Sequence, residues 1–417
     1  MNIAVISTGT ELLRGGTVNT NLACLGSLLT AGGSAPVLEL AVGDREGDLW
    51  SALGMALRRA ELIVVTGGLG PTTDDLTLET VARFFGLELR RDPELVRKVE
   101  EFWARRHPGG RCPKQQYKQA MVPEGAAVIP NPEGSASGIE IRCDYDRATR
   151  HIFLAPGPPS EFVPMARRHL APRLLELAGN QEAVVGFLVA GVGEAALSAA
   201  VRRVLPGAEF DIAYTAKPEG TCLYLAGPDR EQLKKSLASV AAEVAPAALP
   251  EGEYRLAPWL LGELRRRGLT LSTAESCTGG LVGAEFTAVP GASDVYMGGA
   301  VTYSNRLKRE VLGVPEEVLA LRGAVSSETA EAMAAGAAAK FGTDAAVSVT
   351  GIAGPDGGTP DKPVGTVWIG ATLRGRSATR LWRLRGERDA VRLQSAAKAL
   401  LLLRELLLAE DGGPEAC

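Results

Sequence analysis

Three short segments in this chain of 417 residues have the pattern of a strand, and each is followed by a turn that contains glycine. The segments are residues 62–66, 269–274 and 347–350, and the turns that follow contain Gly67-Gly68-Leu69-Gly70, Gly279-Gly280 and Gly351-Ile352-Ala353-Gly354. Buried strands that end in such turns and alternate with helices are typical of α/β proteins. In these proteins ligands bind at the carboxyl ends of the strands. The chain is therefore predicted to be an α/β protein with its chemistry at these turns.

The chain is too long for one hydrophobic core, and its patterns predict three domains. Residues 1–170 alternate strand and helix signals, as a parallel α/β sheet requires. Residues 171–250 contain a βαββα pattern, which predicts a small α+β connecting module, and end in the linker-like sequence 245–250. Residues 251–417 form a third predicted domain, also α/β, that opens and closes with a helix.

The same patterns predict individual elements. In the first domain we expect strands at residues 3–7, 37–42, 62–66, 127–129 and 151–154, and helices at 19–29 and 46–60. In the middle module we expect strands at 183–190, 209–215 and 221–225, and helices at 194–205 and 229–244. In the third domain a helix of small residues, 281–288, should begin directly after Gly280.

The composition, with 46% hydrophobic and 23% charged residues, is that of a soluble globular protein. The net charge of −4 gives no overall attraction to nucleic acid or to an anionic membrane. The segment 399–409 is too short, and too charged at Arg404-Glu405, to span a bilayer, and the N-terminus lacks a signal-peptide pattern. The six cysteines form no CxxC pair, which argues against structural zinc and for reduced thiols: Cys24, Cys112, Cys143, Cys222, Cys277 and Cys417. We therefore expect a cytoplasmic protein without a membrane partner.

The glycine-rich loop of the first domain is followed by two adjacent carboxylates, Asp74 and Asp75. Glycines let a backbone approach a phosphate closely, and a helix N-terminus favours negative charge. Two carboxylates there would repel the phosphate unless a divalent cation lay between them. The alternative is that they only cap the helix that runs to Phe85. Glu11 follows the first strand and should face the same sheet edge, although it could equally be a surface residue.

The turn at residues 275–280 places a hydroxyl, Ser276, and a thiol, Cys277, beside free backbone N–H groups. That arrangement suits a nucleophile next to an oxyanion hole. The chain has three histidines, all outside this domain: His107, His151 and His169. A Ser-His-Asp triad within the domain is therefore excluded, and a base for Ser276 has to be a lysine, a carboxylate or water.

Motifs of the first domain at residues 8–15, 19–21, 66–75, 131–134 and 154–161 resemble the molybdopterin-binding-like domain of the CinA (competence-damage inducible) family. The resemblance implies metal-dependent hydrolysis of ADP-ribose to AMP and ribose 5-phosphate. It implies a divalent metal ion on Glu11, Asp74 and Asp75, with Gly67, Gly68, Gly70 and Asn21 binding the substrate. Many relatives have Asp where this chain has Thr10, which removes one potential metal ligand.

The middle module resembles the KH-type domain that CinA proteins carry between their two larger domains. A KH domain that binds RNA uses a GxxG loop with basic neighbours. Gly191-Val192-Gly193-Glu194 does not supply that loop, and the acid works against phosphate. We therefore expect a packing or dimerisation role without direct nucleic-acid contact, and the family resemblance implies a homodimer.

Motifs of the third domain at residues 273–280, 301–308, 323–326, 350–358 and 362–366 resemble the CinA C-terminal domain, which also occurs as the stand-alone PncC-type nicotinamide mononucleotide amidohydrolase. The resemblance implies conversion of nicotinamide mononucleotide to nicotinate mononucleotide and ammonia, without a cofactor. Ser276 is then the predicted nucleophile and Lys308 its base, because burial can lower the pKa of a lysine. Tyr303 would hydrogen-bond within this dyad or stack on the pyridine ring.

Other residues of the third domain complete the predicted site. The oxyanion hole would come from the N–H groups of Cys277, Thr278, Gly279 and Gly280. The substrate phosphate would be bound by Thr350, Gly351, Arg388 and Arg392, the two arginines having helical i, i+4 spacing. Three simpler alternatives stay open: Cys277 as the nucleophile with a pKa lowered by a helix N-terminus, Ser276 as a helix cap, and Lys308 as a surface lysine.

Two functions from different classes follow. The first is a bifunctional hydrolase that recycles pyridine nucleotides, because ADP-ribose and nicotinamide mononucleotide both arise from NAD. The second is a nucleotide-binding regulator or scaffold linked to DNA uptake or repair, as the family's name suggests, with one or both sites inactive.

Overall fold

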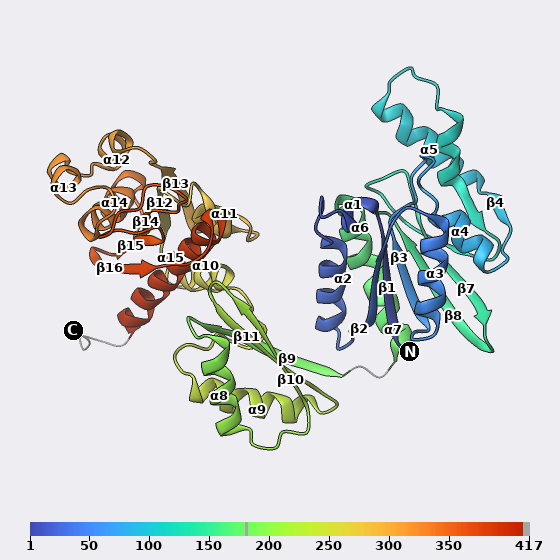
Figure 1. Cartoon of the computed structure of the whole chain (residues 1–417), viewed down its shortest axis with the longest axis horizontal. Coiled ribbons are helices and arrows are strands. Elements are labelled where there is room, and N and C mark those ends of the chain that lie inside the picture. The colour runs from blue at the N-terminus through green and yellow to red at the C-terminus, as the bar shows by residue number, and fades with distance from the viewer. Residues whose placement is uncertain (180–181, 412–417) are drawn as a thin grey trace. The chain divides into compact units, whose positions relative to one another are not determined.

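The computed structural model describes residues 1–179 and 182–411, so Cys417 lies outside the described residues (Figure 1). The chain divides into two compact units, which are described separately: residues 1–184 with 227–229, and residues 185–226 with those from 230 onward. The predicted middle module thus shares most of its residues with the unit that holds the third domain. The three-domain division itself stays a prediction.

The first unit is built on a six-stranded sheet. Its strand order is β2 (Pro36–Val42), β1 (Ile3–Thr8), β3 (Leu62–Thr66), β8 (Ala148–Ala155), β7 (Gly138–Tyr145) and β6 (Ala127–Ile129). The first four strands are parallel; β7 pairs antiparallel with β8, and β6 pairs antiparallel with β7. The prediction of a parallel sheet was therefore incomplete, because β7 alternates charged with apolar residues and joins β8 through a tight turn at Asp146-Arg147.

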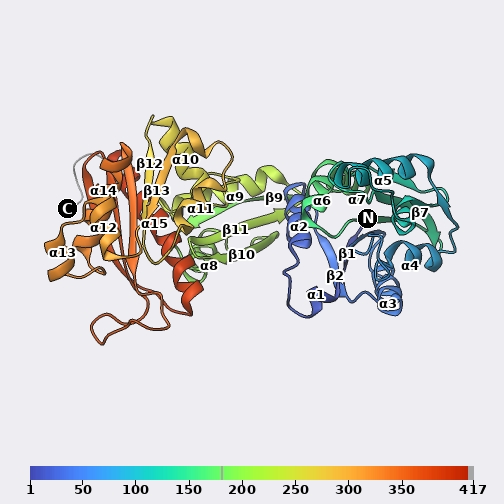
Figure 2. The same cartoon turned by 90° about the horizontal axis from the view of Figure 1, so that it is seen from above.

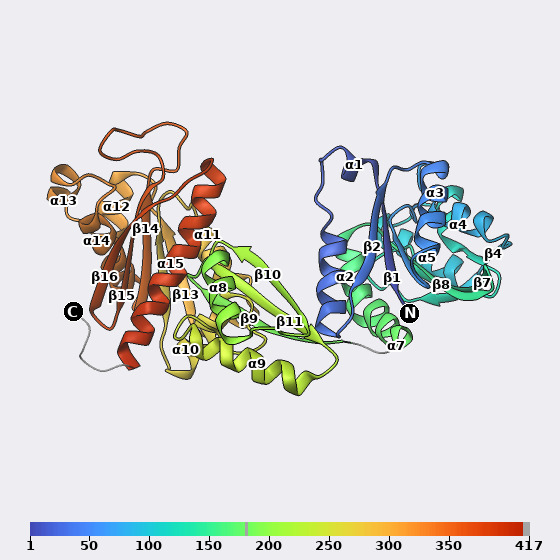
Figure 3. The ribbon, with the colours of Figure 1, turned by 60° about the horizontal axis from the view of Figure 1, so that its bottom comes forward.

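Helices cover both faces of this sheet, as Figure 3 shows. They are α2 (Thr20–Ala31), α3 (Glu46–Leu57), α4 (Thr77–Phe84), α5 (Pro93–Arg106), α6 (Pro159–Met165) and α7 (Ala171–Ala178). The single turn α1 (Thr10–Leu13) lies beyond the end of β1, and β4 (Leu89–Arg91) and β5 (Met121–Pro123) form a separate two-stranded ribbon (Figure 3). Successive side chains of a strand point to opposite faces. Ala4 and Ile6 accordingly belong to the core with α3 and α4, whereas Ile3 and Val5 belong to the core with α2, α6 and α7. The predicted α/β class is confirmed.

The second unit contains a five-stranded sheet with the order β13 (Tyr296–Val301), β12 (Leu271–Glu275), β14 (Ala345–Gly351), β15 (Thr366–Leu373) and β16 (Arg376–Arg383). The first three strands are parallel; β15 pairs antiparallel with β14, and β16 pairs antiparallel with β15. One face carries α10 (Leu256–Arg266), α11 (Leu281–Thr287) and α15 (Arg388–Asp411), and the other carries α12 (Asn305–Leu312), α13 (Glu316–Leu321) and α14 (Ser327–Phe341) (Figure 2). Strand β12 lies between the parallel strands β13 and β14, so the turn that follows it has a strand end on either side.

The middle module follows the predicted βαββα order: β9 (Ala183–Ala190), α8 (Glu194–Val204), β10 (Asp211–Lys217), β11 (Gly220–Gly227) and α9 (Arg230–Glu243). Leu188, Cys222 and Leu249 from this module share one apolar core with α10 and α15. Arg404 of α15 also donates to the carbonyl of Pro246 and stacks on Trp259. These contacts explain why the module and the C-terminal sheet form one compact unit.

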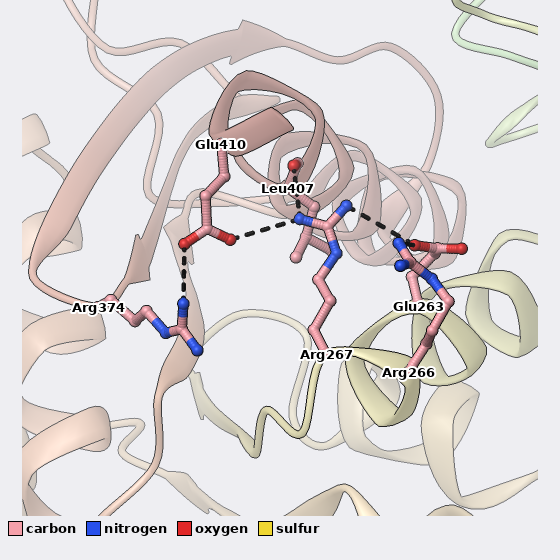
Figure 4. A network of polar contacts seen from close by, with 6 residues as sticks. All are labelled: Glu263, Arg266, Arg267, Arg374, Leu407 and Glu410. Carbon is pink, nitrogen blue, oxygen red and sulfur yellow. Dashed lines mark hydrogen bonds and ion pairs between the residues drawn. The ribbon is translucent and has the colours of Figure 1, made fainter. Parts of the chain in front are cut away.

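Helix α15 is anchored to α10 by the polar network of Figure 4. Arg267, at the end of α10, donates to the Leu407 carbonyl at 3.0 Å and to Glu410 at 3.3 Å, and its side chain is 11% exposed. The other Glu410 oxygen accepts from Arg374, in the turn between β15 and β16, at 3.4 Å. Across the described residues, no helix has both the length and the apolar character needed to cross a membrane.

We expect Arg267→Ala to lower the free energy of unfolding of this unit by about 2 kcal/mol, because it leaves a half-buried carboxylate and a carbonyl without this donor. Arg266→Ala is the matched control: its side chain is 64% exposed in an i, i+3 pair with Glu263, so the loss should stay below about 0.5 kcal/mol. Urea unfolding of both variants measures the difference. Equal losses would show that the Arg267 network does not anchor α15.

Candidate functional site

The predicted nucleophile follows β12 in a tight turn. Ser276 is 8% exposed, and its N–H donates to the Val349 carbonyl on β14 at 2.9 Å. Helix α11 begins only at Leu281, and its N-cap is Gly280 in a left-handed conformation. The alternative in which Ser276 caps this helix is therefore wrong. Its hydroxyl is available to the group that faces it from α12.

That group is Lys308, the fourth residue of α12. Its side chain is 1% exposed, and its Nζ lies 2.9 Å from the Ser276 Oγ and 2.8 Å from the Thr302 carbonyl oxygen. The surface-lysine alternative is therefore wrong. Burial lowers the pKa of Lys308 from 10.5 to about 8, because removal from water disfavours the charged ammonium. No carboxylate among the described residues forms an ion pair that would offset this effect. A neutral amine beside a serine hydroxyl can accept its proton.

Burial makes Cys277, the competing nucleophile, less reactive, whereas it makes Lys308 a better base. The Cys277 side chain is 4% exposed, and burial raises the pKa of the thiol to about 11. The expectation of a pKa lowered by a helix N-terminus was wrong, because α11 begins four residues later and desolvation dominates. Cys277 is therefore a thiol at neutral pH.

The backbone donors of the turn differ in availability. Gly279 N–H donates to the Ser276 carbonyl at 3.1 Å, and Gly280 N–H donates to the Glu275 carboxylate at 2.9 Å. Among the described residues, no carbonyl or carboxylate accepts from the N–H groups of Cys277 and Thr278. Of the four predicted oxyanion donors, these two remain available.

Glu275 is a site residue that the sequence reasoning missed. It is 2% exposed, and its carboxylate also accepts from Val282 N–H at 3.1 Å and Gly283 N–H at 2.8 Å. The available signal was an acid placed just before a helix start, where a carboxylate can satisfy unpaired N–H groups.

Tyr303 is 61% exposed, and its hydroxyl accepts from Arg388 at 3.0 Å. This hydroxyl therefore contacts an arginine rather than the Ser276–Lys308 dyad, although the Tyr303 carbonyl oxygen lies 3.5 Å from the Lys308 Nζ. Stacking of its exposed ring on a pyridine stays a prediction.

The residues predicted to bind phosphate divide into two groups. Arg388 donates to the Gly354 carbonyl at 2.7 Å, and Arg392 donates to the carbonyls of Cys277 at 3.2 Å and Thr278 at 3.1 Å. Both arginines thus lie at the nucleophile turn and its neighbouring loop. Thr350 is 1% exposed and donates to the Ala324 carbonyl, and Gly351, the last residue of β14, pairs with Val367.

The first unit has a cleft of about 560 Å³ at the carboxyl ends of β1, β3 and β8. This size suits a nucleotide-sized ligand. The cleft gathers every residue predicted for the first site: Glu11, Asn21, Gly67, Gly68, Gly70, Asp74 and Asp75. Gly67 and Gly68 have φ of 105° and 65°, and a Cβ on Gly67 would lie 2.4 Å from the Thr8 carbonyl oxygen, so only glycine fits this turn.

Asp74 and Asp75 converge on one hydroxyl. Both carboxylates accept from the Thr72 hydroxyl, and that hydrogen bond is the main cause of the lowered pKa of Asp74. Helix α4 begins later, at Thr77, with Leu76 as its N-cap and no side-chain capping bond. The alternative in which the two aspartates cap this helix is therefore wrong.

Among the residues that the structure describes, no lysine, arginine or histidine lines the cleft, although Lys118 lies just outside it on the Thr72 and Asp75 carbonyls. Five carboxylates line it: Glu11, Asp44, Asp74, Asp75 and Glu161. Within the described ranges, no three His, Cys, Asp or Glu side chains form a group that could hold a metal ion. The paired oxygens of Asp74 and Asp75 nevertheless fit a hard divalent cation, since Mg²⁺ is commonly held by one or two carboxylates together with substrate phosphates. The metal site stays a prediction.

Asn21 joins the loops at the bottom of this cleft. It is 7% exposed, and its Nδ2 donates to the Thr66 hydroxyl at 3.1 Å and to the Gly157 carbonyl at 2.8 Å. These bonds hold the ends of β3 and β8 together beneath the glycine turn.

Two family models match separate parts of this chain, one for each of the two larger predicted domains. The family model of the CinA C-terminal domain matches residues 254–407, and that of the probable molybdopterin binding domain matches residues 4–176. A competence-damage inducible protein of Symbiobacterium thermophilum is 42% identical over 97% of this chain and 98% of its own. A CinA-like protein of Dictyoglomus thermophilum is 38% identical over 98% of this chain and 100% of its own.

Among solved structures, the competence/damage inducible protein CihA of Agrobacterium tumefaciens is 43% identical, covers 36% of this chain and 93% of its own, and has a TM-score of 0.36. The sequence matches confirm the predicted resemblance for the two larger domains, while the KH-type identity of the middle module stays a prediction. This chain belongs to the CinA (competence-damage inducible) family.

Proposed function

We propose that the C-terminal site is a serine–lysine amidohydrolase that converts nicotinamide mononucleotide to nicotinate mononucleotide and ammonia. The observation that carries the proposal is the 2.9 Å contact between the Lys308 Nζ and the Ser276 Oγ, with both side chains buried. The family resemblance supplies the substrate. The geometry supports the reaction class, because amide hydrolysis needs a nucleophile, a base and a proton for the leaving ammonia.

The dyad accounts for each proton. Neutral Lys308 accepts the Ser276 proton as Oγ bonds to the carboxamide carbon. The resulting ammonium then donates this proton to the departing NH₂ group, which leaves as ammonia while the carbonyl forms an ester with Ser276. Neutral Lys308 next takes a proton from water as the hydroxide adds to the ester carbon. Return of that proton to the Ser276 Oγ breaks the ester and releases the carboxylic acid, which loses its own proton to solvent to give nicotinate mononucleotide, and the dyad is restored.

A pH profile tests the role of Lys308. Since only the neutral amine can act as base, kcat/KM should rise about tenfold per pH unit below pH 8 and level off above it. Below pH 8 the lysine also costs stability, because it keeps a buried charge, whereas the unfolded chain carries that charge in water. Lys308→Met should therefore abolish turnover but raise Tm at pH 7. A flat kcat/KM between pH 6 and 9 would exclude Lys308 as the base.

We propose a second activity for the cleft of the first unit: metal-dependent hydrolysis of a nucleoside diphosphate sugar, with ADP-ribose as the substrate that the family resemblance implies. The supporting observation is a glycine turn beside paired carboxylates in a cleft without cationic side chains. Asp74 and Asp75 would hold a divalent cation, which when bound would neutralise the pyrophosphate and activate water. The N–H groups of the glycine turn would bind the phosphate oxygens, and Glu11 would orient the water.

The alternative is a nucleotide-binding regulator, in keeping with the competence-damage names of the relatives. It predicts that both sites bind nucleotides without turnover. Calorimetric titration beside product analysis separates this role from the enzymatic one.

A further inference from the structure

We propose that Glu275 and Arg392 are positioning residues that clamp the nucleophile turn from two sides, so that the N–H groups of Cys277 and Thr278 form the oxyanion hole. The inference rests on the amidohydrolase function proposed above and deepens it. It assigns Arg392 to the turn rather than to the substrate phosphate.

Glu275 fixes the side of the turn that leads into α11. Its two carboxylate oxygens accept three N–H groups, those of Gly280, Val282 and Gly283, at 2.8–3.1 Å. These donors would otherwise be unpaired at the helix start, and a buried carboxylate is costly without such bonds. The acid therefore ties the first turn of α11 to the end of β12, immediately before Ser276.

Arg392 fixes the opposite side of the turn. Its Nε and Nη2 donate to the carbonyls of Cys277 and Thr278, and its Nη1 donates to Asp389 at 3.0 Å. A guanidinium can hold two carbonyls at once because its donors lie in one rigid plane. Three of its five N–H groups are thus committed within the protein.

The planarity of the peptide bond determines the direction of the two free N–H groups. In a trans peptide the C=O and the following N–H point in opposite directions. Because the Cys277 carbonyl faces Arg392, the Thr278 N–H points away from it. Because the Ser276 carbonyl accepts from Gly279, the Cys277 N–H points away from Gly279. Arg392 thus orients the Thr278 N–H, and the bond between Gly279 and Ser276 orients the Cys277 N–H, which leaves two donors directly after the nucleophile, as an oxyanion hole requires.

Two conservative variants of the full chain test the clamp: Glu275→Gln, which replaces one acceptor with a donor, and Arg392→Lys, which keeps the charge but cannot hold both carbonyls. Each is assayed with nicotinamide mononucleotide and with nicotinamide riboside, which lacks the phosphate. We expect kcat to fall about 10²-fold or more for both substrates, with KM within about threefold and the pH profile still centred near pH 8. A rise in KM for the mononucleotide alone in Arg392→Lys would overturn the assignment, because it identifies a phosphate ligand.

Amide hydrogen exchange tests the clamp independently of activity. Residues 280–283 should exchange faster in both variants than in the wild type, and unchanged exchange in both would overturn the proposal. Glu285→Gln is the matched control, since this carboxylate of α11 pairs with Arg255 and does not touch the turn; it should keep wild-type kcat and exchange. A wild type that releases no ammonia would refute the proposed function, while the exchange data would still decide whether the clamp exists.

Discussion

Ser276→Ala should reduce kcat for ammonia release from nicotinamide mononucleotide by at least about 10⁴-fold. The reason is that the substitution removes the atom that attacks the carboxamide, while Lys308 and the turn stay in place. Among the described side chains, the Ser276 hydroxyl forms a hydrogen bond only with Lys308, so its loss should leave the fold unaffected. Steady-state ammonia release, with circular dichroism as a check of folding, measures the effect.

Cys277→Ala is the matched control for this result. The buried thiol, whose pKa is raised to about 11, cannot supply a thiolate at neutral pH, so the variant should keep kcat within about tenfold of the wild type. Its stability should fall by about 1 kcal/mol, because the change leaves a small cavity. Full activity in Ser276→Ala together with inactivity in Cys277→Ala would reverse the assignment of the nucleophile.

The double substitution Asp74→Asn with Asp75→Asn should reduce metal-stimulated AMP release from ADP-ribose by at least about 10³-fold. Both carboxylates share the Thr72 hydroxyl, so one retained aspartate could compensate for the other. Lys118 lies beside this loop, but its Nζ donates to the Thr72 and Asp75 carbonyls and pairs with Glu79, so it should not replace a bound cation. Product analysis across a range of Mg²⁺ and Mn²⁺ concentrations measures it.

Metal titration provides a readout that does not depend on turnover. Mn²⁺ binding, followed by calorimetry or by paramagnetic relaxation, should weaken in the double variant and remain in Asp146→Asn. Asp146 lies in the turn after β7, outside the cleft, with a φ of 48° that asparagine also adopts readily. Equal Mn²⁺ affinity in the double variant and the wild type would rule out these aspartates as metal ligands.

The parts of the sites that lie next to a strand end could be predicted from the sequence. Strand patterns followed by glycine-containing turns marked β3, β12 and β14, and parallel pairing brings such ends to one edge. The residues of the first cleft, although far apart in the chain, therefore meet as expected.

Burial was harder to predict than position. Lys308 lies one helical turn before the buried Leu312, so the i, i+4 spacing on α12 was a signal for its inward face. The family resemblance, rather than this spacing, identified Lys308 as the base. The thiol of Cys277 was misjudged because its pKa depends on desolvation and on where α11 begins, and a local motif shows neither.

The antiparallel strands that extend the two larger sheets were the part of the fold that the sequence predicted least well. Strand β7 was missed because its charged residues alternate with apolar ones, unlike the continuous apolar runs of the central parallel strands. Glu275 was missed for a different reason: its place shortly before a helix start was a signal, but its bonds to three N–H groups form only in the folded turn.

The most direct measurement is ammonia release from nicotinamide mononucleotide by the purified full-length chain at pH 8 in the presence of EDTA. We predict equal amounts of ammonia and nicotinate mononucleotide, with a rate that EDTA does not change, because Ser276 and Lys308 supply the nucleophile and the base. Binding of the nucleotide by a folded wild type without any ammonia release would contradict the account and favour the regulatory role.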